Sequence, residues 1–242
     1  MSRSDIVKAL SDAVSKSNAL HQAYLESSET LSAYEQFVAL QLAYFMPRYD
    51  VLRTTQAYSD AIDFVVSDLT GTGIAQRDRE LERVVPMMTK FLPAKALAAL
   101  ATAMVLNARI LEINLGIAEQ LAAPLAAGEP ISERDYCLAT RAVATFDDFD
   151  ELIAMTRSAG ESLARIVKVP MIRSLLKSMR LPARMAGVTD LQTFLERGLD
   201  TFVALDDTPR FLDDMETHMR ELFGRIFQTP SASLDRAAIE LT

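Results

Sequence analysis

The segment from residue 94 to about residue 123 limits the possible folds more than any other part of the chain. It is apolar on almost every side of a helix, and such a helix is stable in water only when other helices surround it. Leu, Ala and Met are more prominent than Val and Ile, which favours helices over strands. We therefore predict an all-α, single-domain bundle of about eight to ten helices around this central helix. The predicted helical domain covers residues 1–229, and residues 230–242 form a polar C-terminal tail.

Helical periodicity recurs on both sides of the central segment. Apolar residues spaced three or four apart, together with capping residues and prolines, predict helices over 5–26, from Ser27 or Ser28 to Pro47, 50–70, a charged segment up to Pro93, 132–145, 148–168, 170–181, 190–205 and 209–227. Thr189 and Gln192 have the spacing of a capping box, and Thr208 has the position of a cap before Pro209.

Composition narrows the classes of protein. The net charge of −8 disfavours nucleic-acid binding, which needs a basic surface. Cys137 is the only cysteine, so no disulfide forms within the chain. The N-terminus lacks the apolar core of a signal peptide, and Asn107 and Arg109 interrupt the longest apolar run. We therefore expect a cytoplasmic protein without a transmembrane segment.

A Gly-Thr-Gly turn and a dense run of charges separate two apolar segments between residues 64 and 93. Gly71 has the position of a left-handed residue after a helix. The charged sequence RDRELERVV, which begins at Arg77, starts the next helix. We interpret its charges as the solvated face of that helix.

The same region carries a family resemblance. The residues that carry it are Pro47, Arg48, Tyr49, Phe64, Asp68, Leu69, Gly71, Arg77, Asp78, Leu81, Arg83, Pro86, Leu92 and Pro93. They resemble the pattern of the bacterial FFLEELY-motif protein family, although the motif itself reads FVVSDLT here, with Ser67 and Thr70 in place of Glu and Tyr. The stretch LPARMAGVTDLQTFLERGLDTF resembles the C-terminal half of that family. The resemblance implies an all-helical fold and transfers no catalytic residue.

Two amides interrupt the apolar stripe of the central helix. Asn107 and Asn114 are seven residues apart, which places them on one face of that helix. Buried amides need hydrogen-bonding partners, so we expect both side chains to be substantially buried. They either bond neighbouring helices and fix the packing register, or they line a ligand pocket.

A metal site has little support in the sequence. The chain has two histidines, and neither has a glutamate three residues before it, as a di-iron helical bundle would require. Asp214 and His218 are one helical turn apart and His21 is distant in sequence. A charge pair on a helix surface explains the Asp214–His218 spacing equally well.

The strongest charge anomaly is the segment 162–189. It contains six basic residues and no acidic residue, within a chain that is acidic overall. Arg173, Lys177 and Arg180 follow helical spacing, with an apolar face opposite them. Such a basic amphipathic helix binds an anionic lipid, protein or small molecule, or else it pairs with acidic helices of the same chain.

These patterns favour a binding protein over an enzyme. We expect a non-catalytic binding or interaction protein in which the basic segment, residues 165–184, faces an anionic partner. The rival hypothesis is an enzyme that acts on an apolar small molecule in a pocket inside the helical bundle. This hypothesis includes a metal-dependent enzyme. The sequence identifies no catalytic residue and no cofactor.

Overall fold

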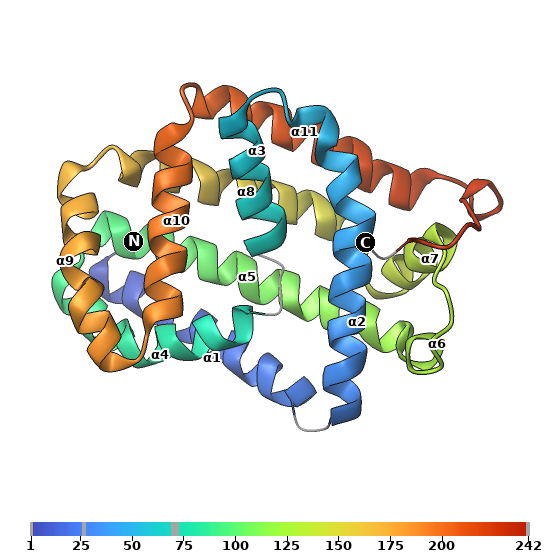
Figure 1. The fold of residues 1–242 in the computed structure, drawn as a ribbon, viewed down its shortest axis with the longest axis horizontal. Helices are drawn as coiled ribbons and strands as arrows, with labels where there is room; N and C mark the ends of the chain where they lie inside the picture. Colours follow the sequence, from blue (N-terminus) through green and yellow to red (C-terminus); the bar gives the residue numbers. More distant parts are fainter. Residues whose placement is uncertain (1, 26–27, 69–72, 241–242) are drawn as a thin grey trace.

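The computed structural model describes residues 2–25, 28–68 and 73–240 of the chain. Within these residues every regular element is helical (Figure 1). The elements are α1 (Arg3–Leu25), α2 (Ser28–Phe45), η1 (Met46–Leu52), α3 (Gln56–Asp63), η2 (Phe64–Asp68), α4 (Ile74–Phe91), α5 (Ala94–Gln120), α6 (Ala122–Ala126), α7 (Glu133–Val143), α8 (Phe146–Val167), α9 (Pro170–Ala186), α10 (Thr189–Ala204), α11 (Thr208–Gln228) and η3 (Ser231–Ser233). The predicted all-α fold is confirmed.

Helix α5 lies at the centre of the bundle, as the sequence predicted. It crosses the middle of the molecule and contacts α1, α8, α7 and α2 (Figure 1). Its first half packs into a core formed with α1, α4, α9 and α10, where Leu97 is fully buried. Its second half packs into a larger core with α2, α3, α7, α8 and α11, where Ile117 is buried. The apolar circumference of α5 therefore serves two cores that lie along its length.

By length and composition alone, α5 is also apolar enough to cross a bilayer. The central helix of a soluble protein meets the same criteria. In this fold Arg109 bonds Asp148 of α8, and Lys16 of α1 bonds Glu112 of α5. Arg109 and Glu112 of α5 thus have partners on the helices that surround it.

The segment predicted as one helix over 50–70 is divided. Pro47 stands in the first turn of η1, and Thr55 then starts α3 by accepting a hydrogen bond from the backbone N–H of Tyr58 at 3.1 Å. Arg53 holds the break by donating to Asp63 at 2.7 Å. The predicted role of Gly71 lies outside the described residues.

Two predicted helix starts are also wrong in detail. Val188, which provides no side-chain cap, precedes α10, so Thr189 and Gln192 form no capping box. Helix α11 is capped by Asp207, one residue before the predicted Thr208.

Helix α9 extends beyond the predicted residue 181 and ends at Ala186. Gly187 follows it, and the positive φ of 67° at this residue suits glycine.

The segment after α11 lies against α7. Leu234 is buried, and Ala238 forms an isolated antiparallel bridge with Ser132. Arg141 of α7 donates to the backbone oxygen of Thr229 at 2.6 Å. Backbone contacts and one apolar anchor thus attach part of the polar tail to the bundle.

Candidate functional site

Asn107 belongs to a buried polar cluster between α1, α4 and α5, which we call the Asp78 cluster. It comprises Ser17, Asn18, His21, Asp78 and Asn107. One carboxylate oxygen, Oδ2 of Asp78, accepts from Ser17 Oγ, from His21 Nε2 at 3.0 Å and from Asn107 Nδ2 at 3.0 Å. Asn107 itself is partly buried, and its amide joins α5 to the other two helices.

The Asp78 cluster has the residue types of a serine hydrolase but a different geometry. Ser17 donates to the carboxylate and not to the imidazole, so the imidazole is not placed to take the proton of this hydroxyl. The other ring nitrogen of His21 lies 3.0 Å from the hydroxyl of Tyr24. Burial raises the pKa of Tyr24 to about 12, which keeps this hydroxyl protonated and able to donate. The cluster therefore links helices and does not assemble a nucleophile.

The charged run at the start of α4 is only partly a solvated face, so that prediction needs correction. Asp78 and Glu80 are both buried. Glu80 accepts from the backbone N–H of Leu191 at 2.8 Å and so caps the start of α10. Arg83 donates to the backbone oxygen of Ala186 at 2.7 Å, at the end of α9. Charges that the sequence assigned to solvent thus attach α4 to α1 and to the α9–α10 turn.

A sequence signal for these buried charges does exist. Asp78 lies three residues before Leu81 and seven before Val85, both of which are buried. It therefore belongs to the apolar stripe of α4. His21 likewise extends the buried stripe of α1, seven residues after Val14.

Asn114 is buried, and its amide pairs reciprocally with the amide of Gln41 in α2. Gln41 Nε2 donates to Asn114 Oδ1 at 2.9 Å, and Asn114 Nδ2 donates to Gln41 Oε1 at 3.3 Å. The pair holds α2 against α5, as expected for an amide that fixes packing register. Neither Asn107 nor Asn114 lines the two surface grooves described below.

We expect the variants Gln41→Ala and Asn114→Ala to be non-additive. Each single change leaves one buried amide without its partner, whereas the double variant removes both. The double variant should therefore be more stable than the sum of the single losses predicts, by about 1 kcal/mol. Urea denaturation of the four proteins measures this difference, and additive losses would contradict the pairing.

A further buried carboxylate, Glu133, lies at the first turn of α7. It accepts from the hydroxyl of Tyr44 at 3.2 Å, from Arg48 at 3.4 Å and from Arg225 Nε at 3.1 Å. Arg48 also lies over the ring of Tyr44, 3.7 Å from its centroid. Glu133 thus joins α2, η1, α7 and α11 through residues that the sequence analysis did not connect.

Asp214 and His218 are not brought together with His21. Asp214 accepts from the hydroxyl of Tyr58 at 3.2 Å. His218 packs on Tyr49, with the ring centroids 4.9 Å apart, and its Nε2 atom is buried without a hydrogen-bond partner among the described residues. In the described part of the chain, no group of three or more His, Cys, Asp or Glu side chains is arranged to hold a metal ion.

His218 is expected to reduce stability as the pH falls. Burial lowers its folded-state pKa below the ordinary value of 6.5, although the Arg48 carbonyl and Glu221 act in the opposite direction. Below pH 6.5 the unfolded state therefore binds more protons than the folded state, and unfolding becomes easier. His218→Gln should flatten the decline in the free energy of unfolding between pH 7 and 5. An unchanged slope in urea titrations would contradict this.

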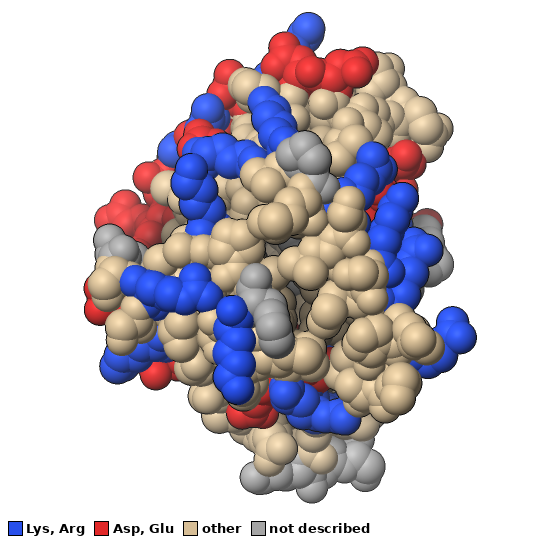
Figure 2. All heavy atoms as spheres, turned by 90° about the vertical axis from the view of Figure 1, so that its left-hand side faces the viewer, with Lys and Arg blue, Asp and Glu red and all other residues tan. Residues whose placement is uncertain are grey.

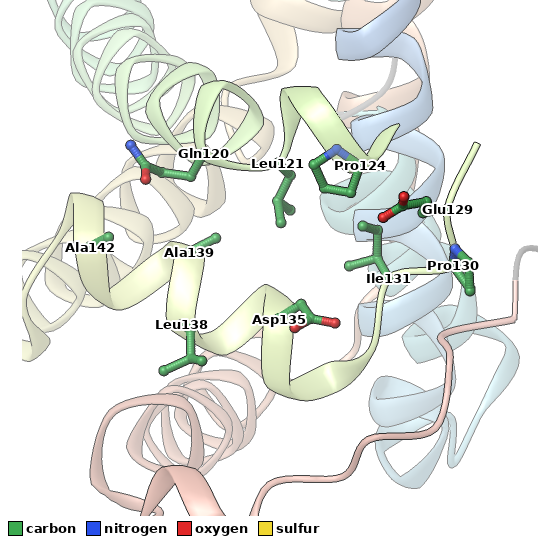
Figure 3. A pocket seen from close by; sticks show the side chains of 10 residues that line it. All are labelled: Gln120, Leu121, Pro124, Glu129, Pro130, Ile131, Asp135, Leu138, Ala139 and Ala142. Carbon is green, nitrogen blue, oxygen red and sulfur yellow. The ribbon is translucent and has the colours of Figure 1, made fainter. Parts of the chain in front are cut away.

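Two surface grooves are present among the described residues. The first, of about 430 Å³, lies between the end of α5, α6, α7 and the loop before α7 (Figure 3). Its Asp135 side chain is already used to cap α7 with Ser132. The second, of about 380 Å³, lies between α1, α5 and α8, with Ala9, Ala13 and Ala108 in its lining. The lining of the second groove also includes Lys16 and Arg109, which both donate to Glu112.

Most of the basic segment forms α9, which pairs in part with α10, whereas Arg165 lies in the last turn of α8 and Lys168 directly follows that helix. Arg173 donates to Asp200 at 2.7 Å, and both guanidinium contacts of Arg180 to Glu196 are 2.7 Å long. The hydrogen bonds from Arg180 are the largest cause of the lowered pKa of Glu196. For these two arginines the structure agrees with the second interpretation of the segment, pairing with acidic residues of the same chain.

Of the other four cations of the segment, Arg165 lies 3.9 Å from Glu161, and three have no ion pair with the described residues. These are Lys168, Lys177 and Arg184, and all three are exposed. The same helix exposes three apolar side chains: Met171 by 58%, Leu181 by 65% and Met185 by 82%. Figure 2, which views the side of the molecule where α9 lies, shows uncharged surface with Lys and Arg side chains around it. The sequence pattern predicted the exposed cations of α9. It did not predict the apolar side chains on the outer surface.

One comparison with known proteins identifies a family for this chain. A family model described as Domain of unknown function (DUF8198) matches residues 20–233. No curated protein and no solved structure gives a significant match. The matched residues include Asp78, Glu133 and the whole of α9. Since the model matches most of the chain, this protein belongs to the family described as Domain of unknown function (DUF8198).

Proposed function

We propose that this chain is a non-catalytic binding protein that presents the outer face of α9 to an anionic partner. The observation that carries the proposal is the set of unpaired cations in an acid-free segment of an acidic chain. Lys168, Lys177 and Arg184 are exposed and have no ion pair with the described residues. Arg173 and Arg180, in contrast, are already neutralised by α10 and contribute less.

The packing of α9 supports this role. Its buried side chains, including Ile172 and Ala183, attach it to the bundle, while Arg83 and Glu80 of α4 hold the turn into α10. A helix fixed in this way offers its outer face without the cost of ordering a free segment. The proposal includes a cytoplasmic location and a relationship to the FFLEELY-motif proteins of bacteria, whose pattern residues Tyr49, Asp78 and Arg83 have packing roles here.

A triple variant tests the proposal. We expect the wild-type protein to bind phosphatidylserine vesicles or poly-L-glutamate at low salt. The variant Lys168→Gln, Lys177→Gln, Arg184→Gln should bind the same probe about 150-fold more weakly, because each exposed cation contributes roughly 1 kcal/mol near an anionic surface. Its thermal stability should be unchanged, since the three side chains have no described ion pair. Co-sedimentation and fluorescence titration measure binding, and no binding of either probe would refute the function.

A further inference from the structure

The exposed side chains of α9 divide into two adjacent flanks. Successive residues of a helix are rotated by about 100°, so Lys177 and Arg184 lie within one narrow sector beside Arg173 and Arg180. Leu181, Met185 and Met171 follow in the next sector, together with Ser174 and Ser178. Ile172 and Ala183 lie on the opposite side and are buried. The outer surface of α9 therefore places an apolar flank beside a cationic one.

The composition of this surface distinguishes between two kinds of anionic partner. Protein interfaces are enriched in aromatic residues, Met and Arg and depleted in lysine, and their anchors are seated in pockets, so lysine, aromatic residues and pockets distinguish the two kinds of partner here. The outer surface of α9 carries Lys177 and no aromatic residue. Neither of the two described grooves is lined by α9. Flexible apolar side chains beside lysine and arginine are typical of helices that lie in a lipid headgroup region.

We propose that the outer face of α9 binds the surface of an anionic lipid membrane. Met171, Leu181 and Met185 would enter the headgroup region, while Lys168, Lys177 and Arg184 contact lipid phosphates. This inference rests on the proposed function and specifies its partner. Three apolar side chains and three cations give reversible, salt-sensitive attachment, because stable anchoring requires a larger buried apolar surface.

Binding to a lipid membrane requires the exposed apolar side chains of α9, whereas binding to a soluble polyanion does not. The double variant Leu181→Ser, Met185→Ser keeps every charge and should lower partitioning onto vesicles of phosphatidylcholine and phosphatidylserine about tenfold. Its binding to poly-L-glutamate should stay unchanged. Both side chains are largely exposed, so folding should be retained, which the thermal transition by circular dichroism verifies.

A charge variant and a matched control complete the experiment. Lys177→Gln, Arg184→Gln should lower partitioning onto the mixed vesicles by about thirtyfold at low salt. Arg210→Gln, Arg236→Gln changes the net charge equally, at exposed residues of α11 and the C-terminal segment, and should leave partitioning unchanged. Pure phosphatidylcholine vesicles should bind the wild-type protein weakly.

The outcomes separate the two proposals. Vesicle binding that both α9 variants weaken, with the control unaffected, supports a lipid surface. Binding to poly-L-glutamate without vesicle binding would overturn the lipid inference and leave the proposed function standing, with an acidic protein as partner. Vesicle binding that Leu181→Ser, Met185→Ser does not alter would also overturn the lipid inference. Binding to neither probe at low salt would overturn both.

Discussion

Replacing Asp78 by alanine is expected to lower the free energy of unfolding by about 3–5 kcal/mol, because buried donors would lose their shared acceptor. Ser17 and His21 are almost completely buried and both donate to Oδ2 of Asp78. Asn107 donates to the same oxygen from α5. Water cannot readily replace the carboxylate at this depth, so the lost bonds remain uncompensated. Equilibrium denaturation in urea measures the loss.

Two control variants make the Asp78 measurement specific. Asp78→Asn retains one carbonyl acceptor at the same position and should be less destabilising than alanine. Asp60→Ala removes an exposed carboxylate that only accepts from Gln56 along the same helix, and should change stability by less than about 0.5 kcal/mol. A loss for Asp78→Ala that is as small as that for Asp60→Ala would contradict a structural role for the cluster.

Replacing Glu133 by alanine is expected to cost about 2–4 kcal/mol. The buried hydroxyl of Tyr44 and the partly buried guanidinium of Arg48 would lose their acceptor. The loss should be smaller than for Asp78→Ala because the side chain of Arg225 is 58% exposed and becomes hydrated when released. Thermal and urea unfolding measure both effects.

The neighbours of Glu133 provide the matched comparison. Glu133→Gln keeps an acceptor oxygen and should recover part of the lost stability. Arg225→Gln removes only the exposed member of the cluster and should cost less than about 1 kcal/mol. Equal losses for Glu133→Ala and Arg225→Gln would show that the ion pair, and not the buried acceptor, carries the stabilisation.

The sequence predicted most of the helices because their burial follows a local rule. The apolar circumference of residues 94–123 located α5 at the centre, and Ser132 started α7 with the hydrogen bonds of a capping box. The predictions were wrong where a residue distant in sequence supplied the cap of a helix. The start of α10 is capped by Glu80 of α4, so the capping-box pattern of Thr189 was not used. No local pattern records an acceptor that comes from another helix.

In the candidate site, too, local spacing predicted some features, and contacts between helices determined the others. Asn114 and Asn107 were selected because they interrupt an apolar stripe, and both have partners on neighbouring helices. Asp78 was assigned to solvent because it stands among other charges, although its spacing from Leu81 places it on the buried stripe. The pairing of Arg180 with Glu196 depends on α9 folding back against α10. Charge type alone therefore did not separate paired cations from unpaired ones.

Hydrogen exchange in the presence of an anionic probe shows directly whether the outer face of α9 binds an anionic partner. The exchange of backbone amides is compared with and without phosphatidylserine vesicles, and separately with and without poly-L-glutamate, at low salt. We expect slower exchange in α9 and the preceding link at Lys168 with at least one probe, and unchanged exchange in α1 and α5. Unchanged exchange of α9 with both probes, or protection confined to another surface, would contradict this expectation.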